Sequence, residues 1–317
     1  MPLATPNRAR RSSNAVRDIP RSIGMRSGRP ACTLRSVEMT ARDEAKAAVH
    51  AEGTPAASPP TVVVVMPAYN ASKTLERTYA DIPHDIVDRI ILVDDVSRDD
   101  TVDVARRLGL DVSIHSQNLG YGGNQKTCYD AALVLGADIV VMLHPDYQYD
   151  ATRIPALIEP IVEGRADLML GSRFLGDPLA GGMPRWKYVS NRFLTGVENL
   201  AFGLHLSEYH TGLRAYSRRL LETIPYRLNS NDFVFDQELI AQVVAAGGFG
   251  IGEIAVPTRY FEEASSVGFR RSVVYGLATL RVVLRFLLHR ARVRPSRKLT
   301  PRGLRRTGGA AATREKP

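Results

Sequence analysis

Short apolar runs alternate with helix-forming segments along the middle of this 317-residue chain, and this alternation constrains the fold more than any other feature. The first run, residues 62–66, is four valines and a methionine without a polar break, which is typical of a strand buried on both faces. The same pattern predicts further strands at 89–93, 112–115, 139–143, 167–170, 212–216 and 251–256. It predicts helices from Ser72 onward and at 101–108, 123–135, 152–163, 187–202, 233–246 and 270–290. Such alternation implies right-handed crossovers, so we predict one α/β domain with a mostly parallel sheet flanked by helices.

The two ends of the chain are expected to be disordered. Residues 1–60 are rich in Arg, Pro, Ala and Ser and hold few large apolar side chains, so burial cannot offset their loss of conformational entropy. Residues 291–317 form a second basic segment, which ends in Gly- and Ala-rich sequence. The formal net charge of +9 is carried mostly by these ends. The folded domain is therefore expected at 61–269, followed by an amphipathic helix at 270–290.

The cysteines and the first residues bear on the cellular compartment. Cys32 and Cys128 form neither an evident pair nor a metal-binding motif, which suits a reducing compartment. No continuous apolar stretch precedes Thr61, which argues against a secretory signal peptide. We therefore expect a cytoplasmic protein.

The basic tail and the last predicted helix bear on membrane contact. Solubilising surface charge is one explanation of the arginines in the tail, and attraction to anionic lipid head groups is the other. The apolar segment 272–289 is interrupted by Arg281 and Arg285, so we expect core packing rather than a membrane span. Peripheral contact with the inner face of the membrane through the basic C-terminal tail stays as the alternative. No nucleic-acid reading module accompanies the basic ends, so no nucleic-acid partner is expected.

Ligand-type side chains follow five consecutive predicted strands, at the sheet edge where α/β folds bind ligands. In chain order they are Pro67, Tyr69 and Asn70; Asp94 and Asp95; Asn118, Gly120 and Gly122; His144, Asp146 and Gln148; and Arg173. Each group by itself has a plain structural explanation, such as a helix cap, a tight turn or a salt bridge. A helix cap does not explain the adjacent carboxylates of Asp94 and Asp95. Two like charges side by side need stabilising partners such as a base amide, a ribose hydroxyl or a cation. Random capping explains all five groups poorly, so we predict a binding site.

The chemistry of these side chains suits a nucleotide with a metal ion. Asp146 is a natural hard ligand for Mg²⁺ or Mn²⁺. Such an ion would bridge two phosphate groups of a nucleotide and neutralise the negative charge of the leaving group. His144 shifts the preference toward Mn²⁺. Arg173 is suited to binding phosphate oxygens through two hydrogen bonds. The glycine-rich loop at 118–122 opens a helix whose N-terminus can meet an anion, but it has neither dinucleotide nor Walker spacing.

The ordered set of motifs resembles glycosyltransferase family 2, in the dolichyl-phosphate mannosyltransferase-like branch. The set consists of Pro67-Ala-Tyr-Asn70, Asp94-Asp-x-Ser-x-Asp-x-Thr101, Asn118-x-Gly-x-Gly122, Asp146-x-Gln148 and Gly171-Ser-Arg173. The resemblance covers residues 61–269 and implies a GT-A fold, a nucleotide-sugar donor and inversion at the anomeric carbon. It implies a nucleotide pocket lined by Pro67, Tyr69 and Asn70, with Asp94 and Asp95 on the base or ribose. Asp146 matches the second aspartate of the family's Asp-x-Asp metal motif and Gln148 its glutamine, but His144 replaces the first aspartate, which leaves the ion undecided between Mg²⁺ and Mn²⁺.

The resemblance extends to an acceptor side at Arg214, Asp236, Glu238 and Arg259. A polyprenyl phosphate acceptor would bring its own oxyanion as nucleophile, positioned by Arg214 and Arg259, and would need no general base. A saccharide hydroxyl would need a carboxylate to take its proton, for which Asp236 is the first candidate and Glu238 the second. An exposed helix face is the alternative for both carboxylates. His210 is either a distal metal ligand or an ordinary hydrogen-bonded histidine.

Three function classes remain: glycosyl transfer, nucleotidyl transfer and non-catalytic binding of a nucleotide sugar. A nucleotidyltransferase would place a glycine-rich loop with Arg and Lys directly after the first strand, where this chain has Pro67 to Asn70. A sensor that had lost activity would have lost several site residues rather than one aspartate. We therefore predict an inverting glycosyltransferase with polyprenyl phosphate as first acceptor and a sugar hydroxyl as second. The sugar and the nucleotide of the donor stay open.

Overall fold

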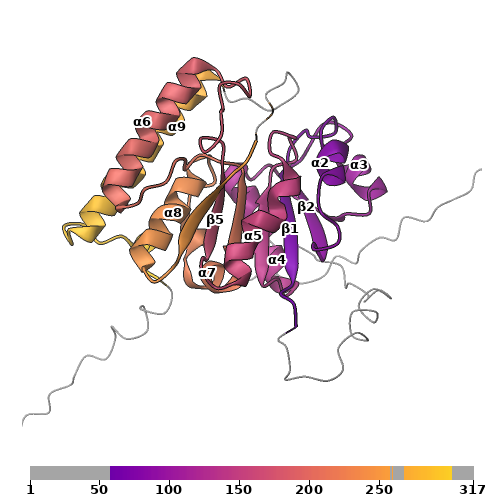
Figure 1. Cartoon of the computed structure of the whole chain (residues 1–317), viewed down its shortest axis with the longest axis horizontal. Helices are drawn as coiled ribbons and strands as arrows, with labels where there is room; N and C mark the ends of the chain where they lie inside the picture. Colours follow the sequence, from indigo (N-terminus) through magenta and orange to yellow (C-terminus); the bar gives the residue numbers. More distant parts are fainter. Residues whose placement is uncertain (1–57, 258, 260–267, 302–317) are drawn as a thin grey trace, which may run out of the picture. The chain divides into compact units, whose positions relative to one another are not determined.

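The computed structural model describes residues 58–257, 259 and 268–301 (Figure 1). Within them, a seven-stranded sheet has the order β3-β2-β1-β4-β6-β5-β7. The strands are β1 (Val62–Ala68), β2 (Arg89–Asp94), β3 (Asp111–Ile114), β4 (Ile139–Leu143), β5 (Leu168–Ser172), β6 (Leu213–Ser217) and β7 (Ile251–Ala255). Only β6 among these runs against its neighbours, pairing antiparallel with both β4 and β5. The predicted mostly parallel sheet is therefore confirmed.

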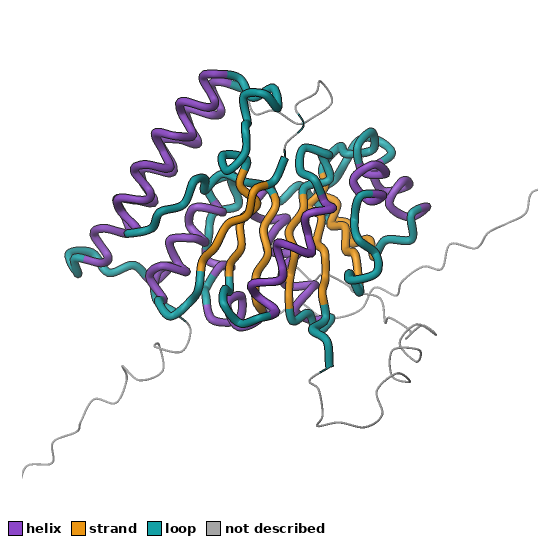
Figure 2. Tube along the Cα trace, viewed as in Figure 1, coloured by secondary structure: helices purple, strands orange, loops and turns teal. Residues whose placement is uncertain are grey.

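Helices cover both faces of this sheet (Figures 1 and 2). The described helices are α2 (Leu75–Ala80), α3 (Thr101–Arg107), α4 (Tyr121–Val134), α5 (Ile154–Val162), α6 (Arg185–Phe202), α7 (Arg218–Thr223), α8 (Phe235–Ala246) and α9 (Phe269–Arg290), with 3₁₀ turns at Ala151–Arg153, Tyr226–Leu228 and Arg297–Leu299. Along β1, Val63 and Val65 pack into one apolar cluster while Val62 and Val64 pack into the other. Because side chains alternate across a strand, this run of valines buries both faces of β1, as expected.

Most element boundaries lie within a few residues of the predictions, and the exceptions lie after β6 and in the tail. The helix α7 and the two 3₁₀ turns after it were not predicted. The tail was expected to be disordered from residue 291, yet Leu299 is buried among the residues that pack on α8. The Lys298 carbonyl also accepts a hydrogen bond from Gln242 Nε2 (2.9 Å). Residues 1–57 of the leader and 302–317 of the tail lie outside the described residues.

Three strands end in backbone conformations that few residues adopt. Asn70, Val96 and Tyr147 have φ values of 53°, 66° and 58°, and they follow β1, β2 and β4 respectively. Positive φ is unfavourable for a residue with a side chain and most of all for a β-branched one such as Val96. Such strain persists where surrounding contacts over-determine it, and it gathers at functional sites. These three turns surround the sheet edge that the sequence singled out.

The helices α6 and α9 lie side by side and run in the same direction (Figure 1). Leu194 of α6 lies beside Gly276 of α9, and further along, the rings of Phe202 and Phe286 are 4.9 Å apart between centroids. By length and composition α9 is apolar enough to cross a membrane, with a mean hydropathy of 1.4, although no span was expected. Only 22% of that stretch is buried, so core packing accounts for a minor part of its apolar surface.

Candidate active site

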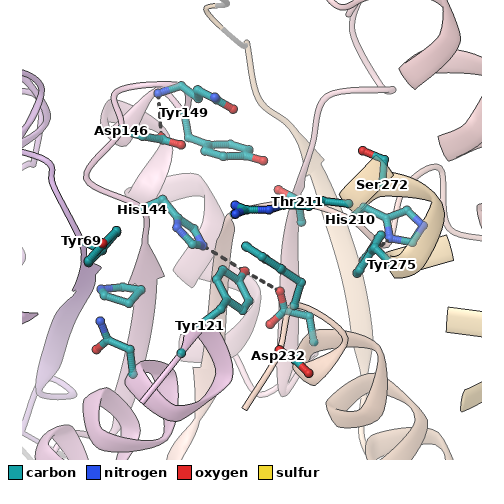
Figure 3. A pocket seen from close by; sticks show the side chains of 18 of the residues that line it. Tyr69, Tyr121, His144, Asp146, Tyr149, His210, Thr211, Asp232, Ser272 and Tyr275 are labelled. Carbon is teal, nitrogen blue, oxygen red and sulfur yellow. Dashed lines mark hydrogen bonds between the residues drawn. The ribbon is translucent and has the colours of Figure 1, made fainter. Parts of the chain in front are cut away.

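A cavity of about 840 Å³ opens at the carboxyl ends of the strands and extends beneath the first turns of α6 and α9. Its strand-end part includes Pro67, Tyr69, Asp95, Asn118, Gly120, His144, Asp146, Gln148 and Arg173. Its helical part includes Trp186, Lys187 and Leu194 of α6 and Arg271, Ser272 and Tyr275 of α9, with Met183 and His210 from the loops before α6 and β6. Figure 3 shows Tyr69, His144 and Asp146 on one side, with His210, Ser272 and Tyr275 on the other. The structure thus brings nine of the twelve predicted strand-end residues to one cavity.

The glycine-rich loop is tied to the end of β2 through Asp95. The backbone N–H groups of Leu119 and Gly120 donate to its carboxylate at 2.7 and 2.9 Å, and His115 Nδ1 lies 2.7 Å from the same group. Asn118 Nδ2 donates to the Asp95 carbonyl (2.9 Å). Asp95 therefore shapes the strand-end part of the cavity through the loop that it holds.

Three of the predicted binding residues support this wall without lining it. Asp94 is buried and accepts a hydrogen bond from the Ser97 N–H (2.9 Å). Asn70 Oδ1 accepts from the Arg98 N–H (2.8 Å) and so joins the turns after β1 and β2. The Gly122 N–H donates to the Asn231 carbonyl (2.7 Å). The exposed Tyr69 ring, by contrast, offers a free face to a planar base.

The turn after β4 presents donors suited to a divalent cation. Burial raises the pKa of Asp146 to about 7, against the lowering effects of the Gln148 N–H that donates to Oδ1 (3.1 Å) and of the nearby Arg173. Because burial destabilises the charged form of this carboxylate, a cation beside it would be stabilising. No group of three His, Cys, Asp or Glu side chains converges within the described part of the chain. An ion held jointly by nucleotide phosphates needs only one or two protein carboxylates, so the donor set of Asp146, Gln148 and His144 fits.

A buried network joins the turn after β4 to helix α8. Asp236 Oδ1 lies 2.6 Å from Arg214 Nη1, and its Oδ2 accepts a hydrogen bond from the Tyr121 hydroxyl (2.7 Å). Gln125 Nε2 donates to the same carboxylate (3.2 Å). Arg214 is 1% exposed, and this pairing corrects the expectation that it contacts an acceptor oxyanion. Asp236, the first candidate for general base, has its oxygens engaged by three donors.

The same network sets the protonation state of His144. The Tyr121 hydroxyl gives its only proton to Asp236, so it must accept at 3.1 Å from a protonated Nε2 of His144. Burial lowers the pKa of His144 to about 4 despite the nearby Asp236 carboxylate, so the imidazole is neutral. Nδ1 is therefore the unprotonated nitrogen, which is the form in which histidine binds metals. Figure 3 shows this chain of hydrogen bonds.

Arg173 and His210 are held mainly by buried carboxylates. Arg173 Nε donates to Glu208 Oε1 (2.9 Å), and its Nη2 donates to the His210 carbonyl (2.7 Å). Burial alone would raise the pKa of Glu208, but the guanidinium and its hydrogen bonds hold it below the ordinary value. His210 Nε2 lies 3.1 Å from Glu198, and its Nδ1 is 2.7 Å from the Tyr275 hydroxyl. Arg173 therefore forms a salt bridge, and His210 is a hydrogen-bonded histidine; these are the plain structural alternatives that the sequence offered for each.

Glu238 and Arg259, like Arg214, do not line the cavity. Glu238, the second candidate for general base, accepts hydrogen bonds from Arg285 and Lys298 at 2.7 Å each, so it stabilises the packing of α9 and the tail on α8. Arg259 pairs with Asp81 (3.0 Å) and stacks on Tyr147, with its guanidinium carbon 4.4 Å from the ring centroid. The backbone N–H of Arg259 donates to the Gln148 carbonyl (3.0 Å), so Arg259 supports the turn after β4 from outside the cavity.

Several cavity residues were missed by the sequence analysis. Tyr121 lies inside the glycine-rich loop that was singled out, but only its contacts reveal its role. Lys187 comes from α6, for which no role was predicted, and Arg271 and Tyr275 come from α9, which was expected to serve core packing. Nothing in the linear pattern indicates that these helices begin at the same cavity.

Comparison with known proteins agrees with this geometry. A family model described as glycosyl transferase family 2 matches residues 63–224. A UDP-N-acetylglucosamine–dolichyl-phosphate N-acetylglucosaminyltransferase of Methanococcus voltae is 28% identical over 224 residues, which cover 65% of this chain and 89% of the relative. A polyprenol monophosphomannose synthase of Mycolicibacterium smegmatis is 25% identical over 212 residues, covering 64% and 79%.

Solved structures with the same fold include glucosyl-3-phosphoglycerate synthase from Mycobacterium tuberculosis. Its complex with UDP matches with a TM-score of 0.58 and 20% identity over 82% of this chain and 86% of that one. Its complex with Mn²⁺, UDP and glucosyl-3-phosphoglycerate matches with a TM-score of 0.54 and 19% identity over 72% and 80%. The predicted GT-A fold is confirmed by this likeness. With the family model covering half of the sequence and the fold in agreement, the chain belongs to glycosyltransferase family 2.

Proposed function

We propose that this glycosyltransferase moves a sugar from a nucleotide-sugar donor to a polyprenyl phosphate, with inversion at the anomeric carbon and with Mg²⁺ or Mn²⁺. The relatives named for dolichyl phosphate and polyprenol support this acceptor class. The observation that carries the proposal is the state of Asp236, whose oxygens are engaged by Arg214, Tyr121 and Gln125. A phosphate oxyanion needs no proton acceptor, so this site suits it better than it suits a hydroxyl.

The nucleotide side of the cavity would hold the donor through the residues already described. The Tyr69 ring would cover the base, while the wall built by Asp95 and the loop at Gly120 would hold the ribose. Asp146, Gln148 and Nδ1 of His144 would hold the metal ion, which would neutralise charge on the departing diphosphate. An acceptor oxygen then forms a bond to the anomeric carbon from the face opposite the diphosphate, whose bond to that carbon breaks. The Tyr121–Asp236–Arg214 network keeps Nδ1 of His144 free of a proton.

A sugar-hydroxyl acceptor is the second candidate, and Asp232 is the observation in its favour. This exposed carboxylate lines the cavity beside Phe233, on the loop before α8. A hydroxyl acceptor would need such a group to take its proton, whereas a phosphate acceptor would not. The two functions therefore predict opposite behaviour when Asp232 is neutralised.

The test is an assay of sugar transfer with a panel of nucleotide sugars and farnesyl phosphate, in Mn²⁺, in Mg²⁺ and with chelator. We expect metal-dependent transfer from one donor, its loss in Asp146→Ala, and near-normal transfer in Asp232→Asn. Transfer to a saccharide alone, lost in Asp232→Asn, would favour the hydroxyl acceptor. Absence of both transfer and donor hydrolysis across the panel would contradict the proposed function.

We also propose contact with the cytoplasmic face of a membrane, carried by an apolar face of α6 and α9 rather than by the tail alone. This α6/α9 face consists of the exposed side chains Val189, Phe193 and Leu200 of α6 and Val273, Val274, Leu277, Leu284 and Leu287 of α9. Arg270 and Arg281 lie in the same α9 stripe at helical spacing, where they would meet anionic head groups. Both helices begin at the cavity, so this face would place its mouth near a lipid-borne substrate.

A further inference from the structure

The helical part of the cavity differs in chemistry from the strand-end part. The strand ends contribute carboxylates, amides and backbone N–H groups, which suit a nucleotide and its cation. The first turns of α6 and α9 contribute two cations, Lys187 and Arg271, together with apolar side chains. A site for a second substrate is expected to differ in this way, because the two substrates must not exchange places.

Lys187 and Arg271 differ from Arg173 and Arg214 in their pairing. Within the part of the chain that the structure describes, neither forms an ion pair, whereas Arg173 is paired with Glu208 and Arg214 with Asp236. Burial, and then the nearby Arg173, lower the pKa of Lys187. A positive charge that is partly buried without a paired carboxylate is poorly stabilised, and a bound anion supplies the missing stabilisation.

Apolar side chains border this cationic pair. Trp186 stands next to Lys187 on α6, and its ring lies 5.5 Å from Nζ of that lysine. Met183 and Leu194 are buried and line this cavity, and Phe233, on the loop before α8, lines it as well. An anionic head with an organic stem matches this arrangement, since burial of the stem adds affinity that a free anion lacks.

We propose that Lys187 and Arg271 bind the phosphate group of the acceptor, a phosphomonoester, while Trp186, Met183 and Leu194 contact the first atoms of its organic stem. This inference rests on the proposed function and assigns the acceptor role that the sequence had given to Arg214 and Arg259. The phosphomonoester has two sources, a lipid such as polyprenyl phosphate or a soluble phosphorylated metabolite. The length of stem that the site accepts distinguishes them.

The experiment measures transfer to farnesyl phosphate and to glycerol 3-phosphate in the full-length protein and its variants. We expect Lys187→Met and Arg271→Gln each to raise the KM for the acceptor about tenfold or more, since each removes a charge-assisted hydrogen bond. The dissociation constant for the donor should stay unchanged. Lys187→Arg should retain most of the affinity. Lys73→Met and Arg290→Gln are matched controls, because both remove an exposed cation outside the cavity.

The outcomes separate this inference from the proposed function. Transfer to farnesyl phosphate that is equally efficient in wild type and both variants would overturn the inference and leave the function standing. Transfer to glycerol 3-phosphate alone, weakened in both variants, would support the phosphate site and reject the lipid acceptor. If wild type transfers to neither, calorimetric binding of farnesyl phosphate decides: binding lost in both variants supports the site, and equal or absent binding overturns it.

Discussion

His144 takes the place of a carboxylate beside Asp146, and this single difference sets the character of the proposed metal site. Its imidazole is neutral, and Tyr121 holds Nε2, so only Nδ1 can face a cation. Imidazole suits Mn²⁺ better than Mg²⁺, while carboxylates suit both.

We therefore predict that His144→Asp raises Mg²⁺-supported transfer relative to Mn²⁺-supported transfer, by about tenfold in the ratio, as for a gain of one charged ligand. The measurement is kcat/KM with each ion at saturating donor. Tyr121→Phe removes the hydroxyl that fixes the tautomer but leaves a histidine at 144, so this variant should keep the wild-type ion preference even where its rate falls. An unchanged ion preference in His144→Asp would show that residue 144 does not touch the metal.

Glu208 is the carboxylate on which the position of Arg173 depends, and it is fully buried. Its pKa is held below the ordinary 4.5, so its contribution to stability is present above that value and is lost as pH falls through the lower, folded-state pKa. We predict that Glu208→Gln lowers the free energy of unfolding at pH 7 by about 3 kcal/mol, because the guanidinium keeps its charge without a partner. Urea unfolding at pH 7 and at pH 4 tests this. The difference between variant and wild type should shrink at the lower pH, and a constant difference would contradict the role of charge.

At the scale of elements, Gly122 in the first turn of α4 is packed too closely to carry a side chain. A Cβ on Gly122 would lie 2.4 Å from the Ser230 carbonyl oxygen and 2.7 Å from Phe235 Cβ. The loop that it would push away carries Asp232 and Phe233, both of which line the cavity. The glycine is therefore required by the close approach of two backbones.

We predict that Gly122→Ala costs about 1–3 kcal/mol of stability through overpacking and also weakens transfer. Gly196→Ala is its control: it lies inside α6 with open space around the added carbon, so it should stabilise by about 0.5–1 kcal/mol. Thermal unfolding and activity of both variants provide the measurement. Equal stability of the two variants would show that the loop carrying Asp232 and Phe233 can move away from an added side chain without cost, which would contradict the prediction.

At the scale of the whole molecule, the α6/α9 face leaves large apolar side chains in contact with solvent. Phe193 is 61% exposed and Leu277 is 64% exposed. An apolar surface spread over two helices is unusual for a monomer without a partner. Its position beside the mouth of the cavity makes a bilayer the partner that fits the proposed acceptor.

We predict that Phe193→Asp and Leu277→Asp each weaken binding to anionic vesicles about tenfold or more, because each removes one buried apolar side chain from the contact. Transfer to soluble farnesyl phosphate should be little changed. Val134→Asp is the control, since Val134 is 72% exposed on α4, away from this face. Vesicle co-sedimentation provides the measurement. Unchanged vesicle binding with a shift in oligomeric state would instead identify a second copy of the chain as the partner.

The sequence by itself determined the local elements and the chemistry of the strand ends. Residues 62–66 could be read as a doubly buried strand because burial on both faces imposes a continuous apolar run. Asp95, Asp146 and Arg173 could be assigned to one edge because parallel strands bring their carboxyl ends together.

Only the tertiary structure decided which of these groups are free to act. Asp236 and Arg214 are far apart along the chain and read as separate site residues, yet they neutralise each other in the interior. Lys187 and Arg271 belong to no motif of the sequence, yet both line the cavity. The physical reason is that pairing and burial depend on contacts between distant segments, whereas periodicity and residue type are local properties.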